Sequence, residues 1–353
     1  MVSILALVCG ATCFNGSRTS GADRPARVAA IVRLGGRDAV EVGPVDNRPA
    51  RVLFVSTATS LSNLAVSPDG SSVAFMLITR PRNETGNPPS PYGCRDQLLL
   101  MSMKAGRIRR FATRGEWMDV MWNPNGGDLL AVETSAEPIP DWMGNDTLWL
   151  LGSGNARRKV VALDEPSYHC GFSGSGNAIL YTTTDHDDAV WIWKPGFRKP
   201  RKLFDEAGAH FSWFAVSPDD RIIAVLVGEG DAANIQFRRF RDGTIMGSAH
   251  YGPEVAYTSI VSMVWSSDSR CLCCTEGSGA VAKVWVYTAD AKLAVSRIAL
   301  PNAVVTGWIP SRKTFVLSSG DGFFVSLWLL SVETKKLSLL FRHPNMVEAV
   351  HVP

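Results

Sequence analysis

The hydrophobic residues of this chain are grouped in short runs that recur with a polar turn between them. Each unit has an apolar run, a turn of the type Ser/Asn-Pro-Asp/Asn-Gly, and a second apolar run. Short alternating or apolar runs bounded by turn residues are typical of β-strands. The units are LAVSPDGSSVAFML from Leu64, DVMWNPNGGDLLAV from Asp119, CGFSGSGNAILYT from Cys170, FAVSPDDRIIAVLV from Phe214, SMVWSSDSRCLCCT from Ser262 and TGWIPSRKTFVLSS from Thr306.

Each unit continues with a strand that has an aromatic centre, such as DTLWLL, AVWIW, AKVWVY and VSLWLL, followed by a turn and a fourth strand. The turns recur every 43 to 56 residues, and propeller blades repeat at roughly 40 to 50 residues. Four short strands per unit predict an all-β propeller. Ten of the eleven tryptophans fall in predicted first or third strands, where we expect them to pack between blades; Trp142 does not.

The two ends of the chain predict how the ring closes. The last residues, MVEAVHVP, resemble a first strand that lacks the other three strands of a blade. The segments ARVAAIVRL, DAVEVGPV and ARVLFVSTA, within residues 26–58, supply three strands. A blade made from both ends would remove the exposed sheet edges of an open array. We therefore predict seven blades over residues 25–353; with six blades, the N-terminal segment would be an added element.

The SPDG turn, the apolar strand after it and the LWLL-type strand resemble the repeat of TolB-like propellers. The repeat is also similar to that of propellers attached to prolyl-oligopeptidase-type peptidases. The resemblance covers most of residues 26–353 and implies a protein-interaction scaffold at the cell envelope. The Trp-Asp ending of the WD repeat is absent, since Lys194 follows Trp193. The histidines that precede first strands, His210, His250 and His343, keep a WD-like interpretation open.

The geometry of a four-stranded meander predicts where a site would lie. The loop that enters the first strand and the loop between the second and third strands share one end of the blade. The two longest insertions, 79–95 and 135–145, are both second-to-third-strand loops, so we expect them on one face, the long-loop face. Loops held by a rigid scaffold commonly carry binding. We predict binding residues on this face at Tyr92, Arg95, Trp117, Asp141, Trp142, Tyr168, His169, His186 and His210.

Trp142 has no predicted strand to pack in, so it is the expected anchor for a protein partner.

No catalytic residue, metal or cofactor is expected. G-x-S-x-G, G-x-G-x-x-G, P-loop and H-E-x-x-H motifs are absent, and GFSGSG at Gly171 lies at a blade turn. Two alternatives remain open. One is a hydrolase or lactonase that uses channel histidines and a metal, and the other is a peptidase-associated propeller without its catalytic domain.

Charge and composition narrow the partners. The 36 Lys and Arg residues nearly balance the 33 Asp and Glu residues, so no nucleic-acid partner is expected. The basic clusters 107–110 and 157–159 are expected to be solvated ends of outer strands.

The sequence of residues 1–24 predicts an export or lipoprotein segment with a linker, and Cys13 is the candidate lipid anchor. A frayed end is the alternative. No transmembrane span is expected, and the predicted location is the periplasm or cell envelope, with the cytoplasm as the alternative.

The cysteines predict packing rather than metal binding. The run CLCC lacks the two-residue spacing and the second ligand pair of most zinc sites. Alternation along a strand places Cys271 and Cys273 on one face and Cys274 on the other. We therefore expect these thiols to act as small hydrophobic residues.

Overall fold

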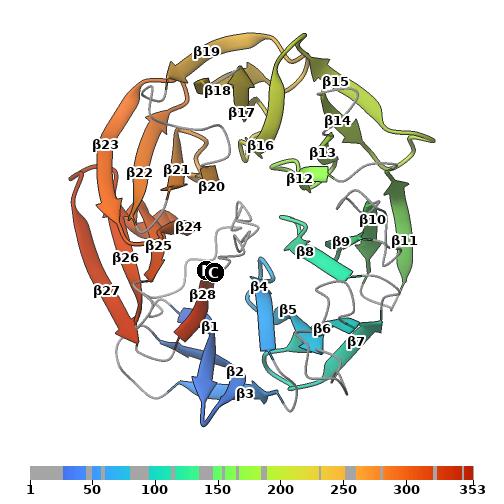
Figure 1. Ribbon diagram of the computed structural model, residues 1–353, viewed down its shortest axis with the longest axis vertical. Helices are drawn as coiled ribbons and strands as arrows, with labels where there is room; N and C mark the ends of the chain where they lie inside the picture. Colours follow the sequence, from blue (N-terminus) through green and yellow to red (C-terminus); the bar gives the residue numbers. More distant parts are fainter. Residues whose placement is uncertain are drawn as a thin grey trace, which may run out of the picture.

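The computed structural model describes residues 27–44, 50–56, 60–79, 95–112, 116–134, 146–152, 156–163, 167–183, 189–229, 232–250, 260–278, 281–320, 324–343 and 346–352. These residues form seven four-stranded sheets arranged around a central axis (Figure 1). The predicted seven-bladed β-propeller is confirmed. Among the described residues, the one helical element is a turn of 3-10 helix, Pro310–Arg312, which lies between two strands.

The first strand of each blade lies nearest the axis and the fourth lies on the circumference (Figure 1). Blade 1 contains β28 (Met346–Val352), β1 (Arg27–Leu34), β2 (Arg37–Pro44) and β3 (Arg51–Val55). Blade 2 contains β4 (Ser60–Val66), β5 (Ser72–Thr79), β6 (Arg95–Ser102) and β7 (Ile108–Ala112). Blade 3 contains β8 (Glu116–Trp122), β9 (Leu129–Thr134), β10 (Asp146–Leu151) and β11 (Arg157–Ala162).

The remaining four blades follow the same order along the chain. Blade 4 contains β12 (Ser167–Phe172), β13 (Ile179–Thr183), β14 (Ala189–Trp193) and β15 (Arg201–Asp205). Blade 5 contains β16 (His210–Val216), β17 (Ile222–Glu229), β18 (Ala232–Arg239) and β19 (Ile245–His250). Blade 6 contains β20 (Ile260–Trp265), β21 (Cys271–Ser278), β22 (Val281–Thr288) and β23 (Leu293–Leu300). Blade 7 contains β24 (Val304–Ile309), β25 (Thr314–Gly320), β26 (Val325–Ser331) and β27 (Leu337–His343).

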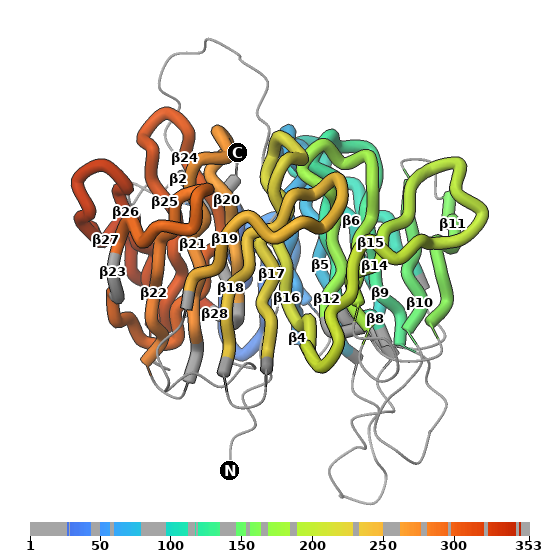
Figure 2. Tube along the Cα trace, turned by 90° about the horizontal axis from the view of Figure 1, so that it is seen from above, coloured from blue at the N-terminus to red at the C-terminus, as the bar shows by residue number. Residues whose placement is uncertain are grey.

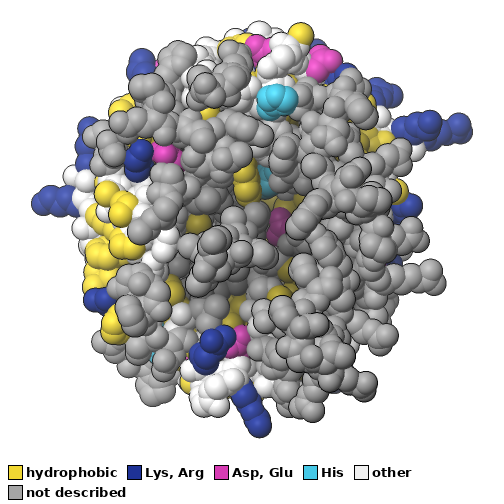
Figure 3. All heavy atoms as spheres, viewed as in Figure 1, with side chains coloured by type: hydrophobic (Ala, Val, Ile, Leu, Met, Phe, Trp, Pro, Cys, Tyr) yellow, Lys and Arg dark blue, Asp and Glu magenta, His cyan; other side chains and the backbone are white. Residues whose placement is uncertain are grey.

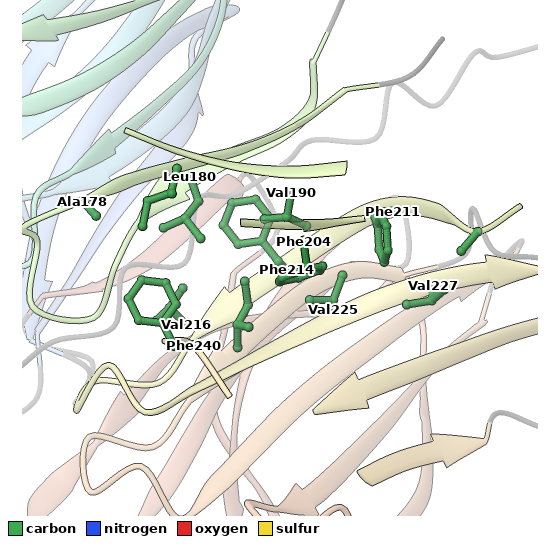
Figure 4. Packing of buried hydrophobic residues seen from close by; sticks show 13 residues of the cluster. Ala178, Leu180, Val190, Phe204, Phe211, Phe214, Val216, Val225, Val227 and Phe240 are labelled. Carbon is green, nitrogen blue, oxygen red and sulfur yellow. The ribbon is translucent and has the colours of Figure 1, made fainter. Parts of the chain in front are cut away.

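Both faces of each sheet are buried, because each blade packs against a neighbour on either side. Side chains alternate along a strand, so successive residues enter different interfaces. Between blades 4 and 5, for example, Leu180 and Val190 face Phe211 and Val225 (Figure 4). The next residue along β13, Tyr181, enters the interface with blade 3 instead. This arrangement explains why the strands are largely apolar rather than strictly amphipathic.

The ring is closed by the two chain ends, as predicted. β28 pairs with β1 in antiparallel register, with Val350 opposite Ala29 and Ala349 opposite Ala30. A buried carboxylate joins the completed blade 1 to blade 2. Asp38, 2% exposed, accepts hydrogen bonds from the Leu61 backbone N–H at 3.0 Å and from Arg33 Nε at 3.1 Å.

The opposite end of the propeller from the long-loop face, here the turn face, is held by hydrogen bonds between blades. The SPDG-type turns also contain hydrogen bonds of their own. In blade 5, Ser217 Oγ donates to Asp219 Oδ1 at 2.7 Å and accepts from the Ile222 N–H at 2.9 Å. Other bonds then cross the interfaces. Asn123 Nδ2 donates to Gly176 O at 3.0 Å, and the Asp219 N–H donates to Ser269 Oγ at 3.1 Å.

The tryptophans lie where the pattern predicted, ten of them in first or third strands. Two of them also join blades by hydrogen bonds. Trp122 Nε1 donates to Ala65 O at 3.2 Å, and Trp265 Nε1 donates to Ala215 O at 2.9 Å. Trp142 lies outside the described residues. Among those that are described, no helix is long and apolar enough to cross a bilayer.

Candidate functional site

The first strand of every blade carries a β-bulge close to the long-loop face. A bulge leaves one residue without a partner in the ladder and turns its side chain in a new direction. The register changes between Ser62 and Ala65, Trp117 and Asp119, Ser167 and Cys170, Phe211 and Phe214, Ile260 and Ser262, Val305 and Gly307, and, in blade 1, between Glu348 and Met346 opposite Ile31 and Val32. These seven places surround the propeller axis at its long-loop end, and this region is here called the channel mouth.

In blades 4 and 5 the bulges bring His169 and Trp213 together. Their ring centroids are 4.5 Å apart, with 37° between the ring planes. The His169 ring also meets the edge of Phe214 at 4.7 Å. Both His169 and Trp213 are partly buried, whereas Phe214 is 4% exposed. An aromatic pair that spans two blades thus lies at the inner ends of β12 and β16.

The surroundings of His169 keep its imidazole neutral. Burial lowers the pKa of His169 to about 4, and a hydrogen bond with the Phe214 backbone opposes this shift only in part. The backbone of His169 is held as well, because its N–H donates to Thr182 Oγ1 at 3.2 Å. A neutral ring fits this position, since burial of a charged imidazole among aromatic rings is unfavourable.

This pKa predicts a pH dependence of folding. The folded-state pKa of His169 lies below the ordinary value of 6.5, so the unfolded chain binds the proton first as the pH falls. The stability from this group is complete above pH 6.5 and is lost as the pH falls to about 4. After allowance for partial exposure, we expect a loss of about 1 to 3 kcal/mol. Urea unfolding across this range should show a steeper loss for wild type than for His169→Gln, and identical curves would contradict the assignment.

Three more of the predicted residues lie at or near the start of a strand at this face. His210 is exposed and is the first residue of β16, three positions before Trp213. Tyr168 shares the bulge of His169. Arg95 begins β6 in blade 2, opposite Thr79. The fold therefore places His169, His210 and Tyr168 near one another by backbone position, while Arg95 lies two blades away from them.

Trp117 occupies a different environment from the one predicted. It is 2% exposed and packs in the interface between blades 2 and 3. The Arg157 guanidinium lies 5.1 Å from the Trp117 ring and 4.2 Å from the Trp149 ring, and its NH2 group contacts Glu133 Oε2 at 2.7 Å. Because its ring is enclosed by these neighbours, Trp117 supports the wall of the propeller and has no ring surface for a partner. Tyr92, Asp141, Trp142 and His186 lie outside the described residues.

Trp213 is the residue that the sequence analysis missed. Alternation along HFSWFAV assigns Trp213 to packing between blades, and the register of an unbulged strand would keep it there. Trp213 does pack against the cluster between blades 5 and 6, but at the bulge between Phe211 and Phe214 its ring also contacts His169 of blade 4. No pattern of residue types revealed the bulge, because inner strands are apolar on both faces and consecutive aromatic residues also suit a regular strand there.

The cysteines within the described strands behave as packing residues, as predicted. Cys273 lies in the interface of blades 6 and 7 and Cys274 in that of blades 5 and 6, while Cys271 packs on the same side as Cys273. Burial, with smaller contributions from Asp119 and Asp146, raises the pKa of the Cys170 thiol, so it stays protonated. Within the described ranges, no group of three or more His, Cys, Asp or Glu residues could hold a metal ion.

Comparisons with known proteins agree with this architecture. No protein-family model and no curated protein matches the chain. Among solved structures it is similar to TolB from Acinetobacter baumannii, with 14% identity and a TM-score of 0.50, over 78% of this chain and 63% of that one. The chain has the fold of a TolB-like propeller.

Two further structures share this TolB-like fold. A prolyl endopeptidase aligns with 17% identity and a TM-score of 0.60, over 93% of this chain but 50% of that one. A putative 6-phosphogluconolactonase from Bacteroides fragilis aligns with 12% identity and a TM-score of 0.62, over 95% of this chain and all of that one. The chain thus spans less than two thirds of TolB and half of the peptidase, and at these identities the likeness concerns the fold.

Proposed function

We propose that this TolB-like propeller is a non-enzymatic scaffold that binds a protein partner at its long-loop face, outside the cytoplasm. A lipid anchor at Cys13, before the propeller, would hold it at the cell envelope. The partner would contact the mouth of the channel and the loops around it. This surface includes His169, Trp213 and His210.

One observation carries the proposal: the partly exposed Trp213 ring packs against His169 at the channel mouth, with the ring planes tilted by 37°. Trp is enriched among the residues that dominate binding energy, especially where neighbouring groups hold the ring in place. His169 and Phe214 provide that support here. A rigid aromatic pair loses little conformational entropy when a partner binds, so it offers affinity at small cost.

Recovery of the partner from native membranes tests this function. We expect Trp213→Ala to reduce recovery about tenfold or more, as loss of a central aromatic contact does. Trp142→Ala is expected to do the same if Trp142 anchors the partner. Met246→Ala is the matched control, since Met246 is 53% exposed on the circumference. Recovery that is unchanged by Trp213→Ala, with an unchanged unfolding temperature, would contradict the proposed surface.

A second candidate is a propeller lactonase, because the putative lactonase aligns over its whole length with this chain. The exposed imidazole of His210 is the described group best placed to act as a base at the long-loop face. This candidate is tested by adding 6-phosphogluconolactone to the purified protein and measuring whether acid is released faster than by spontaneous hydrolysis. A rate equal to the spontaneous one would exclude the lactonase function. An unchanged rate in His210→Ala would exclude His210 as the base.

A further inference from the structure

The circumference of the propeller is strongly basic over three consecutive blades. The outer strands of blades 2, 3 and 4, with the turns that lead into them, are residues 103–112, 156–163 and 193–205. They contain twelve Lys and Arg residues and a single acidic one, Asp205. The cations are Lys104, Arg107, Arg109, Arg110, Arg157, Arg158, Lys159, Lys194, Arg198, Lys199, Arg201 and Lys202. All except Arg109 are exposed.

The three segments form one surface, here called the basic rim. β7, β11 and β15 are successive outer strands of the ring (Figure 1). The Arg158 guanidinium of β11 in blade 3 lies 5.1 Å from the Trp193 ring at the end of β14 in blade 4, so these two segments are in contact. Phe111 of blade 2 packs in the same cluster as Trp149 of blade 3. The basic clusters that are separate in the sequence are therefore adjacent in the fold.

The outer strands of blades 5, 6 and 7 carry fewer basic side chains. The corresponding residues of blades 5, 6 and 7, 239–250, 288–300 and 331–343, contain seven Lys and Arg residues and three acidic ones. Exposed hydrophobic side chains lie there too, among them Ile245, Leu293 and Leu339. Figure 3 shows Lys and Arg side chains projecting from the circumference and hydrophobic side chains gathered along part of it. Lysines that only protect sheet edges would be needed equally on all blades, so edge protection does not explain the asymmetry.

We propose that the basic rim binds a flexible acidic polypeptide segment. This is a second surface, independent of the channel mouth. Charge complementarity identifies the partner as anionic. Three consecutive blades follow a convex arc, which a flexible chain can follow and a flat lipid surface cannot. The Trp193 ring beneath Arg158 is 7% exposed, so it offers little surface for stacking nucleic-acid bases.

The free edges of the outer strands also favour a polypeptide. Among the described strands, β7, β11 and β15 each lie at the end of a four-stranded sheet, with a neighbouring strand on one side. An extended peptide can pair with such an edge through its backbone while its carboxylates meet the flanking cations. Neither a lipid headgroup nor a nucleic acid can form that ladder.

Fluorescence anisotropy with labelled poly-glutamate tests the proposal on the whole chain. The test variant is Lys159→Gln, Lys194→Gln, Arg198→Gln and Lys199→Gln combined. The control variant, Arg241→Gln, Arg312→Gln, Lys335→Gln and Lys336→Gln, removes the same charge from blades 5 and 7. We expect wild type and control to bind poly-glutamate alike, and the test variant to lose affinity by about tenfold or more. Added salt should weaken the binding.

Oligouridine RNA and vesicles containing anionic phosphatidylglycerol serve as competing probes. Tighter binding of either probe than of poly-glutamate would overturn the proposal, as would equal losses in the two variants or no binding by wild type. If the test variant aggregates while its monomer binds poly-glutamate normally, the cations protect strand edges and the proposal is wrong. None of these outcomes depends on the partner of the channel mouth, so the two proposals fail separately.

Discussion

Removal of residues 346–353 is expected to destroy the cooperative unfolding of the propeller. β28 is the first strand of blade 1, and it lies against β24 of blade 7 and β4 of blade 2. Without it, the inner edge of β1 has no partner, and the apolar cluster that contains Ala30, Ile309 and Met346 opens to water. We expect the free energy of unfolding to fall by about 5 kcal/mol or more, which is comparable to the whole stability of many domains.

Urea unfolding monitored by tryptophan fluorescence measures this loss. A chain that lacks only Pro353 is the control, because Val352 still pairs with Arg27. A synthetic peptide of residues 344–353, added to the truncated chain, should restore a cooperative transition by filling the vacant place in blade 1. An unchanged midpoint after truncation would show that the ring does not depend on closure by the C-terminal strand.

The sequence was sufficient to predict the fold because the blades repeat local signals. Three of the turns make the same hydrogen bond, from Ser67 to Asp69, from Ser217 to Asp219 and from Ser266 to Asp268, so these turns keep a similar sequence. The same repetition places the tryptophans in first and third strands. Closure was predictable for a different reason, since an unpaired first strand at one end requires three strands at the other. The pairing of Val350 with Ala29 confirms that inference.

The site was less predictable, because it depends on features that do not repeat in the sequence. Trp213 reaches the channel mouth through a bulge, and one extra residue in a ladder leaves no fixed pattern of residue types. Trp117 had a position on the correct strand, but its burial depends on Arg157 and Trp149 from two other strands. The basic rim was invisible for a similar reason. Its clusters are far apart along the chain, and two of them meet in the fold through the contact between Arg158 and Trp193.

Gly174→Ala is expected to destabilise the turn face strongly. Gly174 lies in the turn of blade 4, where a Cβ would overlap Ser217 O and come within 2.6 Å of Pro218 Cα, both backbone atoms of blade 5. Its φ lies outside the left-handed region, so the expected effect is steric. Because a backbone carbonyl cannot move aside as a side chain can, the two turns must separate. That separation would strain the bond from the Ser175 N–H to Asp220 Oδ1, which joins the same two turns.

We expect Gly174→Ala to lower the free energy of unfolding by about 3 kcal/mol or more, a size reserved for overpacking and similar severe changes. Gly152→Ala is the matched control, because a Cβ at Gly152 meets its nearest atom, Asp128 Oδ1, at 3.5 Å. This control should change stability by less than about 1 kcal/mol. Thermal and urea unfolding of the two variants decide the matter. Equal stability of both would mean that blades 4 and 5 can separate at the turn face without cost, and the hydrogen bonds between their turns would then contribute little to the ring.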